Sequence, residues 1–141
     1  MKVAVFTLCD FARGEGTKMN IIGTFNTIWA HQVPVRYPLC CLAAVLRFER
    51  IEEGPKTLRV SFIDSDGRNV MPTFTTQLNV QFTAAQSEST VQFAVVMQQI
   101  SLPSFGEYSI DLAVDGRQEA STPLYLVQTQ APPQGAQPPA G

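Results

Sequence analysis

The sequence has few of the side chains on which most protein chemistry depends. It contains one histidine and three cysteines, and its 10 basic and 12 acidic residues give a formal net charge of -2. Because a nucleic-acid-binding surface needs a surplus of positive charge, this balance argues against a nucleic-acid partner. Acid–base catalysis needs a group that titrates near neutral pH, so His31 would have to serve alone. We interpret His31 as a surface residue at the end of a strand, and we expect no enzymatic activity.

Long apolar segments are also missing. No part of the chain reaches the roughly 20 consecutive apolar residues that a membrane-spanning helix requires. The N-terminal apolar stretch is only six or seven residues long before Asp10 and Arg13 interrupt it, which is too short for the core of a signal peptide. Three cysteines, two of them adjacent, cannot form a disulfide framework and are typical of reduced thiols in the cytoplasm. We therefore expect a cytoplasmic protein without a membrane partner.

What the sequence does have is an alternation of apolar and polar residues. Leu58, Val60 and Phe62 alternate with polar neighbours, and the same period of two recurs at 78–82 and 108–114. This alternation predicts β-strands with one buried face. The dipeptide at 115–116 is the turn of a hairpin, and its return strand is expected at 118–127. Further strands are expected at 2–8, 18–22, 25–30, 39–48, 57–64, 70–74 and 90–100.

About 8–9 short strands, separated by glycine, proline and Asp-Gly turns, predict an all-β protein. We expect an antiparallel β-sandwich of immunoglobulin-like or related Greek-key type, with a small closed β-barrel as the alternative. Residues 1–128 should form this single domain. Residues 129–141 contain no charged and no large apolar side chain, so they are expected to be a disordered tail that folding does not need.

Metal and cofactor chemistry are not expected. Cys40 and Cys41 are neighbours in a predicted strand, so their side chains point to opposite faces and cannot hold one ion together. Asp64 and Asp66 have the spacing of half a calcium loop, but the residues that follow supply few further oxygen ligands. A tight turn, in which Gly67 adopts a positive φ, explains the same residues without a metal.

Several stretches together resemble one known family. They are LCDFARGEGTKMNIIGTF at 8–25, FIDSDGR at 62–68, FGEY at 105–108 and VDG at 114–116. On these residues the chain resembles an uncharacterised bacterial family, a domain of unknown function, over most of residues 1–128. The resemblance implies a small all-β protein and supplies no activity, cofactor or site residue.

The first candidate site is the segment 10–18, which is the densest polar stretch of the chain. We expect it to be a loop between the first two strands, and its charged residues are Asp10, Arg13, Glu15 and Lys18. Loops at the ends of sandwiches commonly carry binding sites. The alternative is that these charges form ion pairs that only fix the path of the loop.

The second candidate site is an apolar outer face on two strands. If alternate residues of 39–48 fill the core, the residues between them must face outward, and the same holds for 90–98. The outward residues that would meet a partner are Cys41, Ala43, Val45, Ala94 and Val96. Small apolar residues on an outer face predict an interface, either with a second copy or with another protein. The alternative is that another segment of this chain covers them.

These features predict a non-enzymatic interaction or assembly module with an unknown protein partner. A small-molecule enzyme remains an alternative, and it would need Asp10, Arg13, Glu15 and His31 to converge on one pocket.

A carbohydrate- or lipid-binding module is the other alternative. It would need either coplanar exposed aromatic rings or a cluster of carboxylates on its loops. The aromatic candidates other than phenylalanine are Trp29, Tyr37, Tyr108 and Tyr125.

Overall fold

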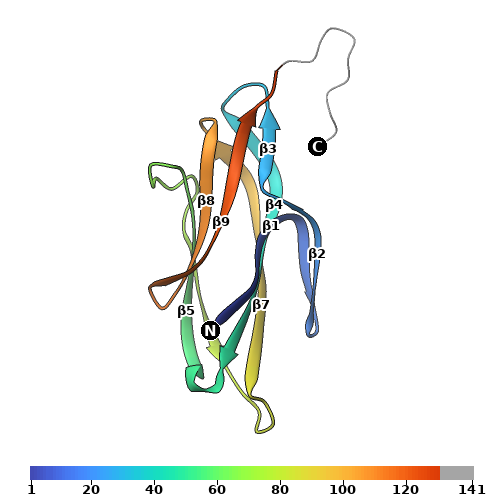
Figure 1. The fold of residues 1–141 in the computed structure, drawn as a ribbon, viewed down its shortest axis with the longest axis vertical. Helices are drawn as coiled ribbons and strands as arrows, with labels where there is room; N and C mark the ends of the chain where they lie inside the picture. The colour runs from blue at the N-terminus through green and yellow to red at the C-terminus, as the bar shows by residue number, and fades with distance from the viewer. Residues whose placement is uncertain (131–141) are drawn as a thin grey trace.

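Two β-sheets packed face to face make up residues 1–130, the part of the chain that this computed structural model describes (Figure 1). The strands are β1 (Lys2–Glu15), β2 (Lys18–Phe25), β3 (Thr27–Ala30), β4 (Val35–Glu49), β5 (Gly54–Ile63), β6 (Phe74–Val80), β7 (Glu88–Leu102), β8 (Gly106–Val114) and β9 (Arg117–Gln128). One sheet has the order β2-β1-β4-β7 and the other β3-β9-β8-β5-β6. The predicted all-β sandwich is confirmed. The predicted tail lies, from residue 131 onward, outside the described residues.

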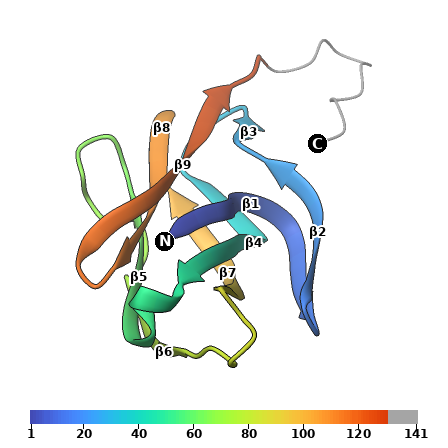
Figure 2. The same ribbon diagram turned by 60° about the horizontal axis from the view of Figure 1, so that its bottom comes forward.

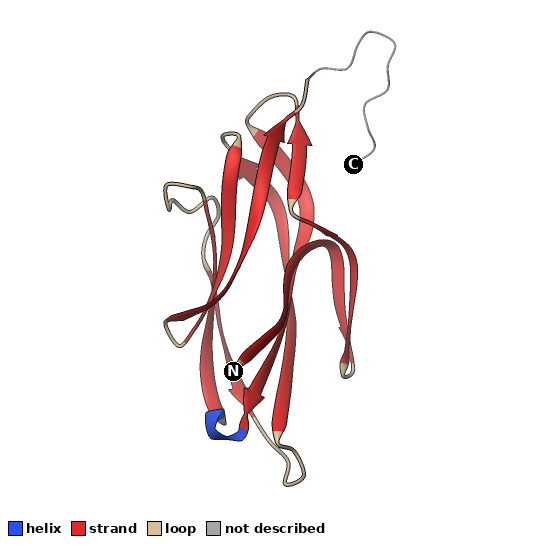
Figure 3. Cartoon of the chain, viewed as in Figure 1, coloured by secondary structure: helices blue, strands red, loops and turns tan. Residues whose placement is uncertain are grey.

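The connections between strands repeatedly cross from one sheet to the other. β4 passes to β5 through the short 3-10 turn η1 (Arg50–Glu52), which Figure 3 shows as the one helical segment of the described chain. All strand pairs are antiparallel except one, since β3 runs parallel to β9 with Thr27 opposite Tyr125. Within residues 1–130, no helix has the length and apolar character needed to cross a membrane.

Tyr108, near the start of β8, fixes the corner where the chain crosses from β7 to the other sheet. Its hydroxyl donates a hydrogen bond of 2.6 Å to the carbonyl of Ser104 and accepts one of 3.2 Å from the Ser104 N–H. The ring itself is buried and packs edge-on against Phe62. Such a tyrosine corner is characteristic of immunoglobulin-like sandwiches. The predicted Greek-key class therefore agrees with both the strand order and this local feature.

The core lies between the sheets and is built from the alternating residues that the sequence indicated. β5 contributes Leu58, Val60 and Phe62, each at most 5% exposed, and β4 contributes Leu42 and Leu46. Burial of such side chains stabilises the fold by roughly 1.5–3 kcal/mol each. The inner faces predicted for these two strands are confirmed.

One predicted strand is absent. Residues 70–74 were expected to pair back onto β5, but an isolated bridge between Ile63 and Asn69 is the main contact there, and β6 begins only at Phe74. The turn is fixed by Asp64, whose carboxylate accepts hydrogen bonds of 2.9 Å from the N–H groups of Asp66 and Arg68. Just beyond it, a proline at position 72 lacks the N–H that a ladder needs.

Candidate functional site

The segment 10–18 is a β-hairpin, so the prediction of a loop is wrong. β1 continues to Glu15 and pairs with β2, with Arg13 opposite Asn20 and Glu15 opposite Lys18. The turn is formed at Gly16, whose φ of +60 suits a residue without a side chain. A two-residue turn lets polar strands pair with few apolar residues, which is why composition alone suggested a loop.

The charges of this hairpin point into solvent. The charged side chains predicted as a site are all exposed: Asp10, Arg13, Glu15 and Lys18. Within residues 1–130 none of them forms an ion pair, so the alternative of a salt-linked loop is also wrong. The carboxylate of Glu15 accepts one hydrogen bond of 3.1 Å from the side chain of Asn20.

The hairpin bends over the outer face of the sheet that contains β4 (Figure 2). Ala12 of the hairpin, together with Cys9 at its base, forms a small buried cluster with Cys41 and Ala43 of β4. The tip is tied to β7 by Gln92, whose side-chain amide donates hydrogen bonds of 3.1 and 2.8 Å to backbone carbonyls at 16 and 18. The chain therefore covers part of its own outer face.

Because the hairpin covers part of this face, the second predicted site is wrong for the residues on β4 that lie beneath it. Cys41 and Ala43 were expected to meet a partner, but they are 2% and 0% exposed beneath the hairpin. Val45 and Ala94 are half-buried. Val96, at 59% exposure, is the member of the set that is fully open to solvent. The free part of the predicted interface is thus on β7 rather than on β4.

β7 is the edge strand of its sheet and is 15 residues long. It pairs with β4 along its whole length, from Glu88 opposite Glu49 to Leu102 opposite Val35, and its other side has no strand partner within the described chain. Residues 89–98, which we term the open edge of β7, carry no charge. Proteins usually protect such an edge with lysines, prolines or bulges. Residues 89–98 contain no lysine or proline; the hairpin tip contacts this strand at Gln92, and Gln99, beyond the end of the open edge, has an irregular φ of +53°.

An apolar cleft borders this open edge. It has a volume of about 310 Å³ and lies between β7 and β6, the edge strand of the other sheet. Its walls include Val91, Phe93 and Val95 from β7 and Phe74 and Leu78 from β6. Phe74 is 41% exposed. The sandwich is therefore open on this side, and apolar side chains of both sheets are accessible there.

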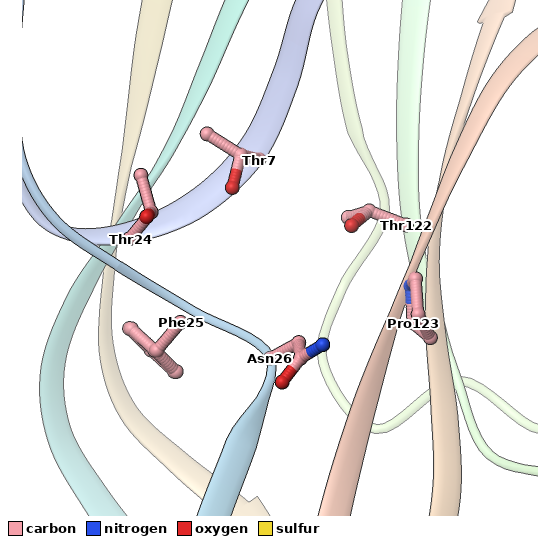
Figure 4. Close-up of a pocket in the computed structure, with 6 residues that line it drawn as sticks. All are labelled: Thr7, Thr24, Phe25, Asn26, Thr122 and Pro123. Carbon is pink, nitrogen blue, oxygen red and sulfur yellow. The ribbon is translucent and has the colours of Figure 1, made fainter.

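Two further hollows flank the crossover from β2 to β3, on the opposite side of the sandwich. The smaller has a volume of about 340 Å³ and is lined mainly by polar side chains (Figure 4). The larger measures about 480 Å³, and its wall includes Asp10, Phe25, Trp29 and Tyr37. Phe25 and Tyr37 stack with ring centroids 5.7 Å apart.

None of the hollows described above within residues 1–130 brings together the four residues that an enzyme would need. Asp10 lines the larger hollow, whereas Arg13 and Glu15 lie further along the hairpin. His31 follows the end of β3, where its Nδ1 lies 3.2 Å from the carbonyl of Thr129.

Three of the four aromatic candidates lie near the crossover from β2 to β3, and the fourth is in the core. Tyr108 is buried in the core, whereas Trp29 is 63% and Tyr125 is 38% exposed. Trp29 and Tyr125 lie on the neighbouring strands β3 and β9. Tyr37 faces the larger hollow beside Phe25.

The cysteines are free and buried. Burial raises the pKa of the Cys40 thiol to about 12, with smaller contributions from its cysteine neighbours and Asp10. Burial likewise raises the pKa of Cys9. A nucleophilic cysteine needs a lowered pKa and access to solvent, so neither thiol is suited to that role. Within residues 1–130 no group of three or more His, Cys, Asp or Glu residues could hold a metal ion.

Comparison with known proteins identifies a family but no activity. A family of unknown function (DUF6941) matches residues 4–127. No curated protein sequence matches the chain. Among solved structures, the chain is similar to the Pseudomonas fluorescens alkylpurine DNA glycosylase AlkC bound to DNA containing an abasic site analog, with a TM-score of 0.48 and 9% identity. That match covers 92% of this chain but 30% of the glycosylase, and it carries no argument about function.

Proposed function

Because this chain belongs to DUF6941, a family of unknown function, we propose its role from geometry: it is a non-enzymatic assembly module that pairs with a second copy of itself through the open edge of β7. The observation that carries this proposal is a long, uncharged edge strand beside an apolar cleft. An unpaired edge presents backbone N–H and C=O groups that another strand can satisfy.

The sequence of β7 favours a second copy over an unrelated strand. If two β7 strands run antiparallel with Val95 on the two-fold axis, residues whose numbers sum to 190 face each other. Gln92 then faces the partner's Gln98, and Ala94 faces the partner's Val96. Ala94 and Val96 thus form an apolar pair on both sides of the two-fold axis, as the symmetry of an isologous interface requires. The amide N–H groups of Gln92 bind the hairpin, which leaves its Oε1 to accept a hydrogen bond from the partner's Gln98.

The lack of charged residues on the open edge is also compatible with a second copy of the chain as the partner. An antiparallel pair brings the residue on the two-fold axis beside its own copy, so a charge at or near the axis would lie close to the identical charge of the partner. Residues 89–98 contain none, and the nearest charged residue of β7 is Glu88 at the far end. The apolar walls of the cleft would also be shielded from water, since Phe93 would face the partner's Met97 on the inner side.

A cross-linking experiment tests the pairing. Val95→Cys places two thiols on the two-fold axis, where opposite side chains lie about 5 Å apart at Cβ, close enough to form an intermolecular disulfide after small adjustments. Val91→Cys is the matched control on the same strand and face, because its two thiols would be about 27 Å apart. We expect a cross-linked dimer from Val95→Cys and not from Val91→Cys under mild oxidation.

Sedimentation measures the assembly without cross-linking. The wild-type chain should be a dimer at micromolar concentration, and Val96→Lys should weaken the dimer by about tenfold or more because it places a charge within the interface. Ile51→Lys is the control, since Ile51 is 90% exposed on the η1 turn, outside the open edge of β7. A wild-type chain that remains monomeric at high micromolar concentration contradicts the proposal.

The compartment is part of the proposal. Three free, buried cysteines suit a reducing environment, and we propose the bacterial cytoplasm as the location. Labelling of the thiols in cell extracts, before and after denaturation, checks that they are reduced in the cell.

A further inference from the structure

The larger hollow beside the β2–β3 crossover combines one acidic side chain with three aromatic ones. We call it the aromatic-acid pocket and define it by Asp10, Phe25, Trp29 and Tyr37. Its volume of about 480 Å³ is enough for a small ligand or one side chain of a partner. No lysine, arginine or histidine is among the residues that line it. The charge of its wall is therefore negative.

Asp10 is exposed, packs against Gly23 and has no cationic partner within the described chain. Its carboxylate lies against the backbone of Gly23, directly across the hairpin, so closely that a Cβ at position 23 would overlap it. Within the described chain it forms no ion pair. A carboxylate that is positioned by its own hairpin and lacks a cationic partner can accept one from outside.

The aromatic residues, like Asp10, favour a positively charged ligand. Phe25 and Tyr37 stack with an interplanar angle of 26°, and Trp29 is 63% exposed at the wall. The faces of aromatic rings carry negative electrostatic potential and attract cations. Burial raises the pKa of the Tyr37 phenol, and the negative charge of Asp10 raises it further, so the carboxylate acts on the aromatic part of the pocket.

We propose that the aromatic-acid pocket binds an organic cation, namely an alkylammonium group whose charge meets Asp10 and whose apolar stem packs on the aromatic rings. An anion would be repelled both by the carboxylate and by the ring faces. The ligand is either a free alkylamine or the lysine side chain of another protein, and both present the same chemistry. The inference is independent of the self-pairing at β7, which lies on the opposite side of the sandwich.

Trp29 supplies a direct measurement, because it is the only tryptophan in the chain. Titration of the full-length protein with n-butylammonium chloride should change its fluorescence in a saturable manner. Sodium butyrate and sodium chloride at equal ionic strength should produce no saturable change, because neither supplies an apolar cation. A response to butyrate as strong as that to butylammonium, or no saturable response to butylammonium, overturns the proposal.

Matched variants locate the binding site. Asp10→Asn keeps the shape of the side chain and removes its charge, and it should weaken butylammonium binding by about tenfold. Asp66→Asn makes the same change at an exposed turn residue outside the pocket and should leave the affinity unchanged. Equal affinities for Asp10→Asn and the wild type overturn the assignment.

The source of the cation is decided by a second probe. Tighter binding of N-acetyl-lysine methylamide than of n-butylammonium assigns the pocket to a lysine side chain, and equal or weaker binding assigns it to a free amine. The same titrations on Val96→Lys should give unchanged affinities, which separates this inference from the proposed dimer. If Val96→Lys abolishes butylammonium binding, the pocket is not an independent site and the proposal is wrong.

Discussion

The carboxylate of Asp10 occupies the space above Gly23 that any other residue would fill with its Cβ. The two positions face each other across the hairpin formed by β1 and β2. Gly23 also has a φ of +70, in the left-handed region that side-chain-bearing residues rarely adopt. The position of the one acidic group in the aromatic-acid pocket therefore depends on a glycine in the facing strand.

Gly23→Ala should destabilise the protein more than a glycine change at another positive φ. The alanine must adopt a strained backbone, which costs about 1–3 kcal/mol, and must also displace the Asp10 carboxylate. Gly67→Ala is the control, because Gly67 has a φ of +81 and a Cβ added there would meet nothing within 4 Å, so only the backbone cost applies. Thermal unfolding checks the order, and equal losses of stability would show that the close approach has no energetic effect.

Tyr108→Phe should lower the free energy of unfolding by about 1–2 kcal/mol, because it removes a buried hydroxyl that satisfies both backbone groups of Ser104. Urea denaturation measures the loss. Tyr125→Phe removes a hydroxyl from a ring that is 38% exposed and should be nearly neutral. If the two variants unfold at the same urea concentration, the corner hydrogen bonds do not stabilise the fold.

Alkaline pH should destabilise the protein through Cys40. Burial raises the pKa of this thiol from 9.0 to about 12, so the unfolded chain loses the proton at a lower pH than the folded chain. Below pH 9 this thiol does not lower the free energy of unfolding. As the pH rises from 9 toward 12, the free energy of unfolding falls by at most about 1.4 kcal/mol per pH unit. Cys40→Ala should reduce this slope in urea unfolding measured over that range. Parallel losses in both proteins would assign the effect to other groups.

Gln92→Ala should release the tip of the hairpin from β7, because two hydrogen bonds from one side chain hold it there. We expect faster amide exchange around residues 16–18 and faster labelling of Cys9 and Cys41 by thiol reagents, while the melting temperature falls by only a few degrees. Gln118→Ala, which changes an exposed glutamine on β9 outside the proposed dimer interface, is the control. Unchanged labelling rates in Gln92→Ala would mean that the apolar contacts alone hold the hairpin in place.

The parts of the fold that were predicted correctly depend on local pattern. The period of two around Val60 identified the strand and its buried face, because a strand turns successive side chains to opposite sides whatever it pairs with. The prediction of which residues of β4 face the core was also right, since Leu42 enters the core and Cys41 lies on the other face. The sequence could not show that Ala12 covers Cys41, because the bend of β1 brings them together from distant positions.

The sequence nevertheless contained a signal that the outer face of β4 is covered. The run of apolar residues at 39–46 is typical of a strand buried on both faces, and two buried faces need no partner protein. The free edge could not be predicted, because which strand is last in a sheet depends on the order of all the others. Asp10 was among the predicted candidates and lines the aromatic-acid pocket, whereas its aromatic neighbours come from β2, β3 and β4 and were not recognisable from the sequence as one pocket.

The parallel pairing of β3 with β9 gives the molecule a preferred response to mechanical load. In Figure 1 both strands run upward, while the chain enters β1 near the lower part of the molecule. A force that pulled β9 forward along its axis, while the segment before β3 was held, would slide these two parallel strands past each other. Their ladder, from Thr27 opposite Tyr125 to Ala30 opposite Gln128, is then loaded in shear, so its hydrogen bonds must break together rather than in sequence.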